Sequence, residues 1–201
     1  MDHLILDEPG VNYQKKLDAV IKEAADSALV PTLLLHSCCG PCSSYVVTYL
    51  KDFFKVTVFY YNPNIYPEQE YQHRLSEQAR LLKELGIDLI EKGYCHEEFL
   101  DQVRGLEAEP EGGKRCTQCF RLRLSRTAEL AKELGFDYFC TTLTVSPHKN
   151  AMVINAVGRE LENEVLWLPS DFKKRDGYKR SIELSGKYGL YRQDYCGCEF
   201  A

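Results

Sequence analysis

The sequence predicts an α/β fold in which a Rossmann-like, mostly parallel sheet carries helices on both faces. Short β-branched and aromatic runs alternate along the chain with longer segments of helical periodicity. Two of the helical segments stop at a glycine, Gly86 and Gly135, the residue that most often follows a helix. Strands that alternate with helices form parallel sheets through right-handed crossovers, so the carboxyl ends of the strands meet at one edge.

The first half of the chain supplies a leading helix and then a β-α-β-α-β order. The strands are expected at residues 32–35, 55–61 and 87–90. The helices are expected at residues 13–28, 43–52 and 68–85. Asparagine and proline make residues 62–67 a loop, and Pro67 suits the first turn of the helix that follows.

The second half continues the alternation up to residue 168. Helices are expected at residues 94–106 and 120–134, and from a turn at 144–150 to about residue 161. Strands are expected at residues 136–143 and 165–168, and Pro169 ends the second. Residues 107–113 break all periodicity just before a pair of cysteines.

The last segment, residues 171–201, has little clear periodicity, but it is rich in aromatic and basic residues. A solvated, disordered tail does not usually carry so many aromatic residues, so we expect it to fold back over the site. We therefore expect one α/β domain over residues 1–201. Residues 1–30 are its N-terminal helical extension and residues 171–201 its tail.

Composition excludes several classes of protein. A hydrophobic content of 44 % with 27 % charged residues is ordinary for a chain that buries a core. No apolar run approaches the ~20 residues of a membrane span, and the first residues lack the basic start of a signal peptide, so we expect a cytoplasmic protein without membrane contact. A net charge of −5 argues against a surface coated for bulk nucleic-acid binding, although it leaves room for a local basic face.

Seven of the nine cysteines fall in three groups that are far apart in the sequence. They are Cys38, Cys39 and Cys42; Cys116 and Cys119; and Cys196 and Cys198. The first group follows the first strand, at the edge where α/β sheets bind ligands, and C-x-x-C spacing lets two sulfurs reach one metal. An iron–sulfur cluster or a zinc ion takes four thiolates, so the surplus indicates a second metal or a catalytic thiol pair.

Two other interpretations of these thiols stay open. A purely structural zinc would use four of them, although such ions usually stabilise domains with poorer cores. The run Cys39-Gly40-Pro41-Cys42 is also typical of thiol–disulfide oxidoreductases, but it explains neither Cys38 nor the two later groups. Cys95 stands alone and Cys140 lies in an apolar strand, so both are left outside the site.

Two histidines lie near the expected edge of the sheet. His36 precedes the first cysteines and is either a proton donor, a partner of a metal ligand, or a packed strand residue. His148 follows the fourth expected strand and opens the next helix, so we expect it to face the same edge.

Five stretches of the chain together form a recognisable pattern. They are residues 38–42, residues 61–65 with Glu70, Tyr71 and Arg74, residues 116–123, residues 141–149, and residues 191–198. In this joint order they resemble the epoxyqueuosine reductase QueH family. The resemblance covers nearly everything from Leu33 to Cys198, and only about the first 30 residues lie outside it.

The resemblance implies an enzyme of the last step of queuosine synthesis, which removes the epoxide oxygen from epoxyqueuosine at the tRNA wobble position without cobalamin. It also implies a [4Fe-4S] cluster and a separate metal ion, iron or zinc, on a Rossmann-like sheet. Some members of the family carry an aspartate where this chain has Cys42. Because a separate metal accepts oxygen ligands, Cys42 suits that metal better than the cluster.

On this basis each thiol receives an expected role. The cluster is assigned Cys39, Cys116, Cys119 and Cys198. The separate metal is assigned Cys38, Cys42 and Cys196. Within neighbouring pairs the division stays open. Asp194, Tyr195 and His148 are the candidate proton donors for the departing oxygen.

A tRNA substrate requires a local basic face despite the acidic total charge. Residues 173–180 form a basic run, in which Lys173, Lys174 and Arg175 are the expected phosphate contacts. Tyr60, Tyr61 or Tyr66 is expected to stack on an extruded base, and Tyr61 is the one assigned to the site. Further positive charge near the second cysteine group comes from Lys114, Arg115, Arg121 and Arg123. Most charged runs are only solvated faces, and a tRNA-binding protein with structural zinc stays an alternative. The electron donor is left open.

Overall fold

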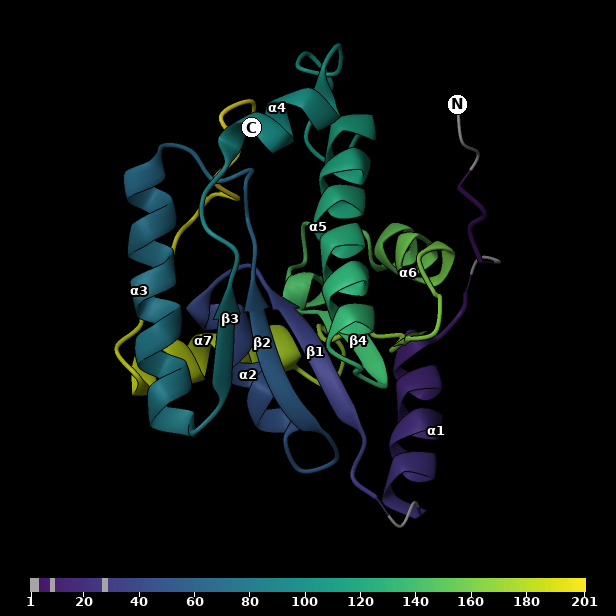
Figure 1. Cartoon of the computed structure of the whole chain (residues 1–201). Helices are drawn as coiled ribbons and strands as arrows, with labels where there is room; N and C mark the ends of the chain where they lie inside the picture. Colours follow the sequence, from purple (N-terminus) through teal and green to yellow (C-terminus); the bar gives the residue numbers. More distant parts are fainter. Residues whose placement is uncertain (1–3, 8–9, 27–28) are drawn as a thin grey trace.

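A computed structural model describes residues 4–7, 10–26 and 29–201, and within them a parallel sheet of five strands in the order β3-β2-β1-β4-β5 (Figure 1). The strands are β1 (Thr32–Ser37), β2 (Lys55–Tyr60), β3 (Asp88–Glu91), β4 (Tyr138–Thr141) and β5 (Leu166–Trp167). The helices are α1 (Tyr13–Asp26), α2 (Gly40–Leu50), α3 (Glu68–Leu85), α4 (His96–Val103), α5 (Lys114–Glu133), α6 (Ala151–Glu160) and α7 (Gly177–Lys187). This confirms the predicted α/β class.

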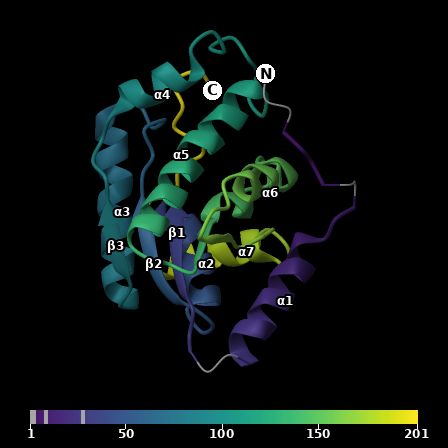
Figure 2. The same ribbon diagram turned by 45° about the vertical axis from the view of Figure 1, so that its right-hand side comes forward.

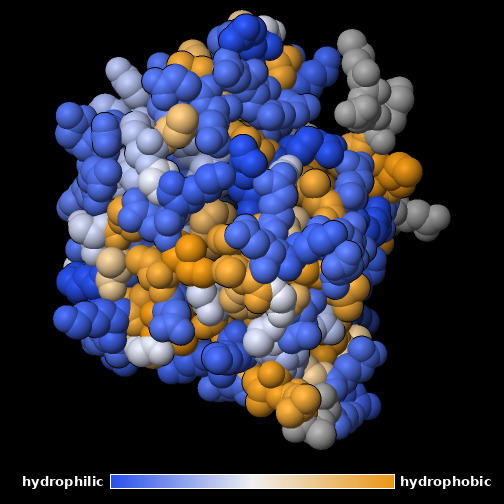
Figure 3. Space-filling view, viewed as in Figure 1, coloured by the Kyte–Doolittle hydropathy of each residue, from blue (hydrophilic) through white to orange (hydrophobic). Residues whose placement is uncertain are grey.

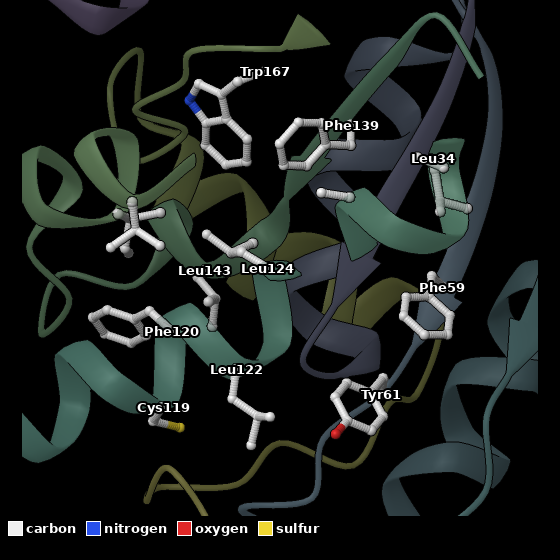
Figure 4. Close-up of a cluster of buried hydrophobic side chains, with 14 of the residues drawn as sticks. Leu34, Phe59, Tyr61, Cys119, Phe120, Leu122, Leu124, Phe139, Leu143 and Trp167 are labelled. Carbon is white, nitrogen blue, oxygen red and sulfur yellow. The ribbon is translucent and has the colours of Figure 1, made fainter. Parts of the chain in front are cut away.

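Successive residues of each strand pack into opposite layers, because side chains alternate between the faces of a sheet. On one face Leu34 and Phe59 contact α4, α5 and α6, and Figure 4 shows this cluster extending from Trp167 to Cys119. On the other face Leu35 and Val58 belong to a cluster with residues of α1, α2, α3 and α7. Figure 2 shows the two layers of helices from a second angle. The sheet is thus buried on both faces, as a parallel sheet requires.

Several boundaries agree with the local sequence signals, and others differ for identifiable reasons. Helix α3 covers the predicted residues and ends at Gly86, whose φ of 67° is the left-handed conformation that glycine adopts freely. Helix α5 begins earlier than predicted, at Lys114, where the Glu109 carboxylate accepts the first-turn N–H of Lys114 at 3.2 Å. The fourth strand is shorter than predicted, because Thr142–Val145 form a 3-10 turn. The predicted end of α1, at residue 28, lies outside the described residues.

Helix α7 lies in the tail, where the sequence showed no periodicity. Its buried positions are Gly177, Ser181 and Ser185, which recur every fourth residue but are small or polar, so the usual apolar stripe is missing. A tight turn precedes the helix, with Arg175 at φ 52° and Asp176 at φ 60°. A Cβ at Gly177 would lie 1.8 Å from the Phe172 carbonyl oxygen, so only glycine fits there.

Hydrophilic side chains dominate the upper part of the face seen in Figure 3, beyond the carboxyl ends of the strands, whereas hydrophobic ones show mainly across its middle and lower part. The exposed hydrophobic residues include Leu29 and Val30, which lie between α1 and β1. Within residues 4–7, 10–26 and 29–201, no helix is both long enough and apolar enough to cross a membrane.

Candidate metal and active site

A cavity of about 610 Å³ lies beyond the carboxyl ends of β1, β2 and β4. All seven grouped cysteines line it: Cys38, Cys39, Cys42, Cys116, Cys119, Cys196 and Cys198. Cys95 and Cys140 are outside it; the Cys140 thiol donates to the Leu168 carbonyl oxygen at 3.2 Å within the core. The fold therefore brings together three thiol groups that are far apart in sequence, at the edge where open α/β sheets hold ligands.

The β1–α2 turn supplies the tightest group of thiols. The sulfurs of Cys38, Cys39 and Cys42 all lie within 4.8 Å of one another, and those of Cys38 and Cys39 are 3.7 Å apart. Below the turn, the Ser37 hydroxyl donates to Gln78 Oε1 at 2.9 Å and shares a 2.6 Å hydrogen bond with the Ser43 hydroxyl. The end of β1 and the start of α2 are thus locked together under the sulfurs.

The pKa values of the three thiols of this turn are shifted in different directions. Hydrogen bonds from Cys39 and Cys42 hold the pKa of Cys38 well below its usual range. The same contact with Cys38 raises the pKa of Cys39 to about 12, and it also raises that of Cys42. A metal ligand must be a thiolate, so binding of a metal ion at this turn would release protons from these thiols.

Helix α5 presents Cys116 and Cys119 from its first turns. The Gly112 N–H donates to the Cys116 sulfur at 3.2 Å, and Cys119 lies at the edge of the core cluster (Figure 4). Burial raises the pKa of the Cys119 thiol. The first two turns of α5 thus bring both sulfurs to the cavity.

The last thiols come from residues 195–201, all described, which form neither helix nor strand. Three side chains hold this segment. Arg74 donates to the Cys196 carbonyl oxygen at 3.2 Å, and Arg115 donates to the Phe200 carbonyl oxygen at 2.8 Å. His96 Nε2 lies 2.5 Å from a Glu199 carboxylate oxygen. A hydrogen bond from the Cys198 thiol lowers the pKa of Cys196 to about 6, and Lys149 and Arg123 act in the same direction.

The three candidate proton donors all line the cavity. His148 and Asp194 are exposed, and the Tyr195 ring is 44 % exposed and stacks under the Arg74 guanidinium at 5.0 Å. Helix α6 begins at Ala151 with Asn150 as its cap, so His148 lies in the preceding loop instead of opening the helix. His36 is fully buried and bonds Thr141 Oγ1 at 2.8 Å, which fits the packed alternative among its expected roles.

The expected RNA contacts lie elsewhere. Among the described residues, the cavity lining includes none of Lys173, Lys174, Arg175 and Tyr61. Lys173 pairs with Asp171 at 2.6 Å and Arg175 pairs with Asp18 at 2.7 Å, whereas Lys174 is exposed.

Burial bears on the expected roles of three residues. The Tyr61 ring is 1 % exposed, stacks on Phe59 and donates its hydroxyl proton to Glu98, so no face of it is open to a base. Arg115 and Arg123 are 2 % and 3 % exposed, so they add no charge to the outer surface.

The cavity lining also includes Asn62, Arg123, Tyr178 and Arg192, for which the sequence predicted no role inside the cavity. A signal for one of them was present. Arg123 follows Cys119 by one helical turn and precedes the buried Thr127 by another, which places a cation on the inward stripe of α5. Tyr178 and Arg192 belong to the tail, where Arg192 lies 5.4 Å over the Tyr178 ring.

The donor set fits an iron–sulfur cluster with a second metal. Seven sulfurs around one cavity provide the four thiolates of a cluster and leave three for another ion. A single structural zinc would leave three cavity thiols without a ligand role.

Comparison with known proteins gives concordant results. The family model described as epoxyqueuosine reductase QueH matches residues 33–201. Proteins named epoxyqueuosine reductase QueH from Streptococcus pyogenes and Staphylococcus epidermidis are 44 % and 42 % identical to this chain. Each alignment covers 95 % of this chain, and 78 % and 84 % of the respective relative.

A solved structure extends the likeness to the fold. It is the U34-tRNA thiolase NcsA from Methanococcus maripaludis with its [4Fe-4S] cluster, at a TM-score of 0.54 and 12 % identity. The match covers 100 % of this chain and 77 % of that one.

Proposed function

This chain belongs to the epoxyqueuosine reductase QueH family, and on that premise we propose that it reduces epoxyqueuosine to queuosine at the wobble position of tRNA without cobalamin. One observation carries the proposal: cysteines from three distant segments line one cavity at the carboxyl edge of the sheet. The likeness in fold to a tRNA thiolase solved with a [4Fe-4S] cluster is compatible with it.

The reaction sets the requirements of the site. Conversion of an epoxide to an alkene consumes two electrons and two protons and releases the oxygen as water. When bound, a [4Fe-4S] cluster supplies single electrons, and a metal ion, iron or zinc, supplies Lewis acidity. The electrons come from a separate reductant.

We propose the following division of the thiols. The cluster is held by Cys39, Cys116, Cys119 and Cys198, and the second metal by Cys38, Cys42 and Cys196. In support, the turn thiols lie within 4.8 Å of one another, so neighbouring sulfurs can serve adjacent centres. Serine variants of Cys39 and Cys196, each analysed for iron, zinc and sulfide, test the division. Loss of sulfide should follow only the change at Cys39.

The protein itself moves the proton that the departing oxygen needs. We propose that Asp194, Tyr195 or His148 donates it, because all three line the cavity and remain accessible to solvent for reprotonation. The variants Asp194→Asn, Tyr195→Phe and His148→Gln, assayed by single turnover of pre-reduced enzyme, identify the donor. The donor variant slows the chemical step and leaves tRNA affinity unchanged.

Binding of tRNA is proposed to use the exposed basic turn and the rim of the cavity. Lys174 has no carboxylate in ion-pair contact among the described residues, while Lys173 and Arg175 can exchange their carboxylates for phosphates. Replacing all three by alanine should weaken tRNA binding and flatten its salt dependence. Unchanged affinity at low salt would remove these residues from the interface.

Thiol–disulfide exchange is the rival function. An exchange thiol must be accessible and have a lowered pKa, whereas Cys39 is 1 % exposed and has a raised pKa. A purely structural zinc would give a colourless protein that retains full function. Iron–sulfur content after anaerobic purification separates these alternatives.

The decisive experiment is anaerobic turnover of epoxyqueuosine-containing tRNA with a chemical reductant. The unaltered protein should form queuosine, and Cys119→Ala should not. The matched control is Cys140→Ala, which removes a buried thiol outside the cavity. We place the reaction in the cytosol, where thiols stay reduced.

A further inference from the structure

Arg123 is a buried cation whose charge no nearby carboxylate balances. Its side chain is 3 % exposed and lines the thiol cavity. Across the part of the chain that the structure describes, no carboxylate lies within ion-pair distance of it. Its neighbours along α5 are different, since Arg121 pairs with Glu160 and Arg126 with Glu129.

Neutral groups hold the guanidinium in place. Its Nε donates to the Cys119 carbonyl oxygen at 3.2 Å, and its Nη1 donates to Asn62 Oδ1 at 3.4 Å. Asn62 in turn donates to the Ser37 carbonyl oxygen at 2.8 Å. The network therefore joins the end of β1, the loop after β2 and the start of α5, all of which border the cavity.

A buried charge is costly unless an opposite charge balances it. The other buried arginines of the region are accounted for differently. Arg74 pairs with Glu70 at 2.6 Å, and Arg115 donates to three carbonyl oxygens, those of Glu107, Glu109 and Phe200. The Phe120 ring lies 5.8 Å from the Arg123 guanidinium and offers only the weak negative charge of an aromatic face. The remaining source of full negative charge for Arg123 is the cavity, whose sulfurs include Cys119.

We propose that Arg123 is the built-in counter-charge of the iron–sulfur cluster and holds its reduction potential high enough for the physiological donor to reduce it. This inference rests on the proposed function, because it needs a cluster in the cavity. Reduction adds one negative charge to the cluster. A fixed positive charge in a site of low dielectric constant stabilises that reduced state more than the oxidised one.

The test is a redox titration of the reconstituted protein, followed by the electron paramagnetic resonance signal of the reduced cluster. In Arg123→Gln the ratio of reduced to oxidised cluster at a fixed potential should fall at least about tenfold, which corresponds to about 59 mV for a one-electron couple. Arg123→Lys keeps the charge and should retain most of the potential.

Two further variants separate charge from structure. Asn62→Asp leaves the guanidinium in place but sets a carboxylate against it, so it should lower the potential as Arg123→Gln does. Arg126→Gln removes the same charge from the same helix at a partly exposed position outside the cavity lining, where Glu129 and Glu98 pair with it, and should not shift the potential.

The outcomes separate a failure of the proposed function from a failure of the counter-charge role of Arg123. If the unaltered protein assembles no cluster, the proposed function fails and this inference fails with it. If the cluster assembles and Arg123→Gln titrates like the unaltered protein, the inference alone is wrong. If Arg123→Gln does not hold a cluster, Asn62→Asp decides, and an unshifted potential in that variant overturns the counter-charge role.

Discussion

The β1–α2 turn and the C-terminal segment 195–201 deliver thiols to the same cavity by different means. The turn is fixed by the backbone, because β1 is the central strand and α2 begins directly after it. The segment is fixed from outside by Arg74, His96 and Arg115. The thiols of the turn should therefore leave the cavity only when the whole fold is lost. The thiols of the segment can leave it while the core stays folded.

The largest effect is expected from the core beneath the turn. Leu35→Ala removes a fully buried side chain of β1 and should lower the free energy of unfolding by about 3 kcal/mol. Chemical denaturation followed by circular dichroism measures this loss. Hydrogen exchange should accelerate in the turn and in the C-terminal segment alike, since both depend on the sheet. Leu134→Ala, at a position 51 % exposed, is the control and should cost little.

The next effect should reach the segment and the loop before α5, but not β1. Arg115→Ala leaves the carbonyl oxygens of Glu107, Glu109 and Phe200 without their donor and should cost about 2 kcal/mol. Hydrogen exchange by mass spectrometry should show lost protection at residues 195–201 and unchanged protection in β1. Equal loss in both regions would contradict the proposed independence. Arg104→Ala, which removes an exposed arginine, is the matched control.

A smaller effect is expected from the backbone of the segment itself. Gly197 has φ +95°, and a Cβ there would lie 3.2 Å from Arg74 Nη1 and from Ile65 Cγ1. Gly197→Ala should therefore cost about 1 kcal/mol and weaken iron retention. Gly189→Ala also places alanine at a positive φ, 56°, but nothing lies within 4 Å of its Cβ. Iron content after dialysis should fall for the first variant and not for the second.

The smallest effect should come from the partly exposed ion pair of the segment. Glu199→Gln removes the charge that faces His96, on a side chain 29 % exposed, and should cost about 0.5 kcal/mol. The unfolding midpoint in denaturant measures it. A change at the exposed Glu183 is the control. A loss as large as that of Arg115→Ala would mean that this pair anchors the segment as strongly as Arg115 does.

The sequence predicts what is local and periodic. The range of α3, its glycine stop and the strand–turn–helix around Cys38 followed from apolar spacing and cap residues. Apolar spacing did not predict α7, because its buried face consists of Gly177, Ser181 and Ser185 instead of large apolar residues.

The anchoring of the C-terminal segment was beyond the reach of sequence patterns. Arg74 contacts Cys196 across 122 positions, and Arg115 contacts Phe200 across 85. No periodicity relates such residues, so the three thiol groups could be predicted to meet, but not what holds the last one. Likewise, the sequence alone indicates a surface charge at Arg123, and only the structure shows that this residue is buried.

The turn at Arg175, Asp176 and Gly177 should determine the heat-capacity change when a partner binds the basic run, residues 173–180. Its left-handed backbone and the close approach of Gly177 to Phe172 fix these lysines and arginines before any partner arrives. No segment of the protein has to fold when a polyanion binds this run. Association should therefore lack the large negative heat-capacity change of coupled folding and binding. Titration calorimetry at several temperatures would then show enthalpies that vary little with temperature.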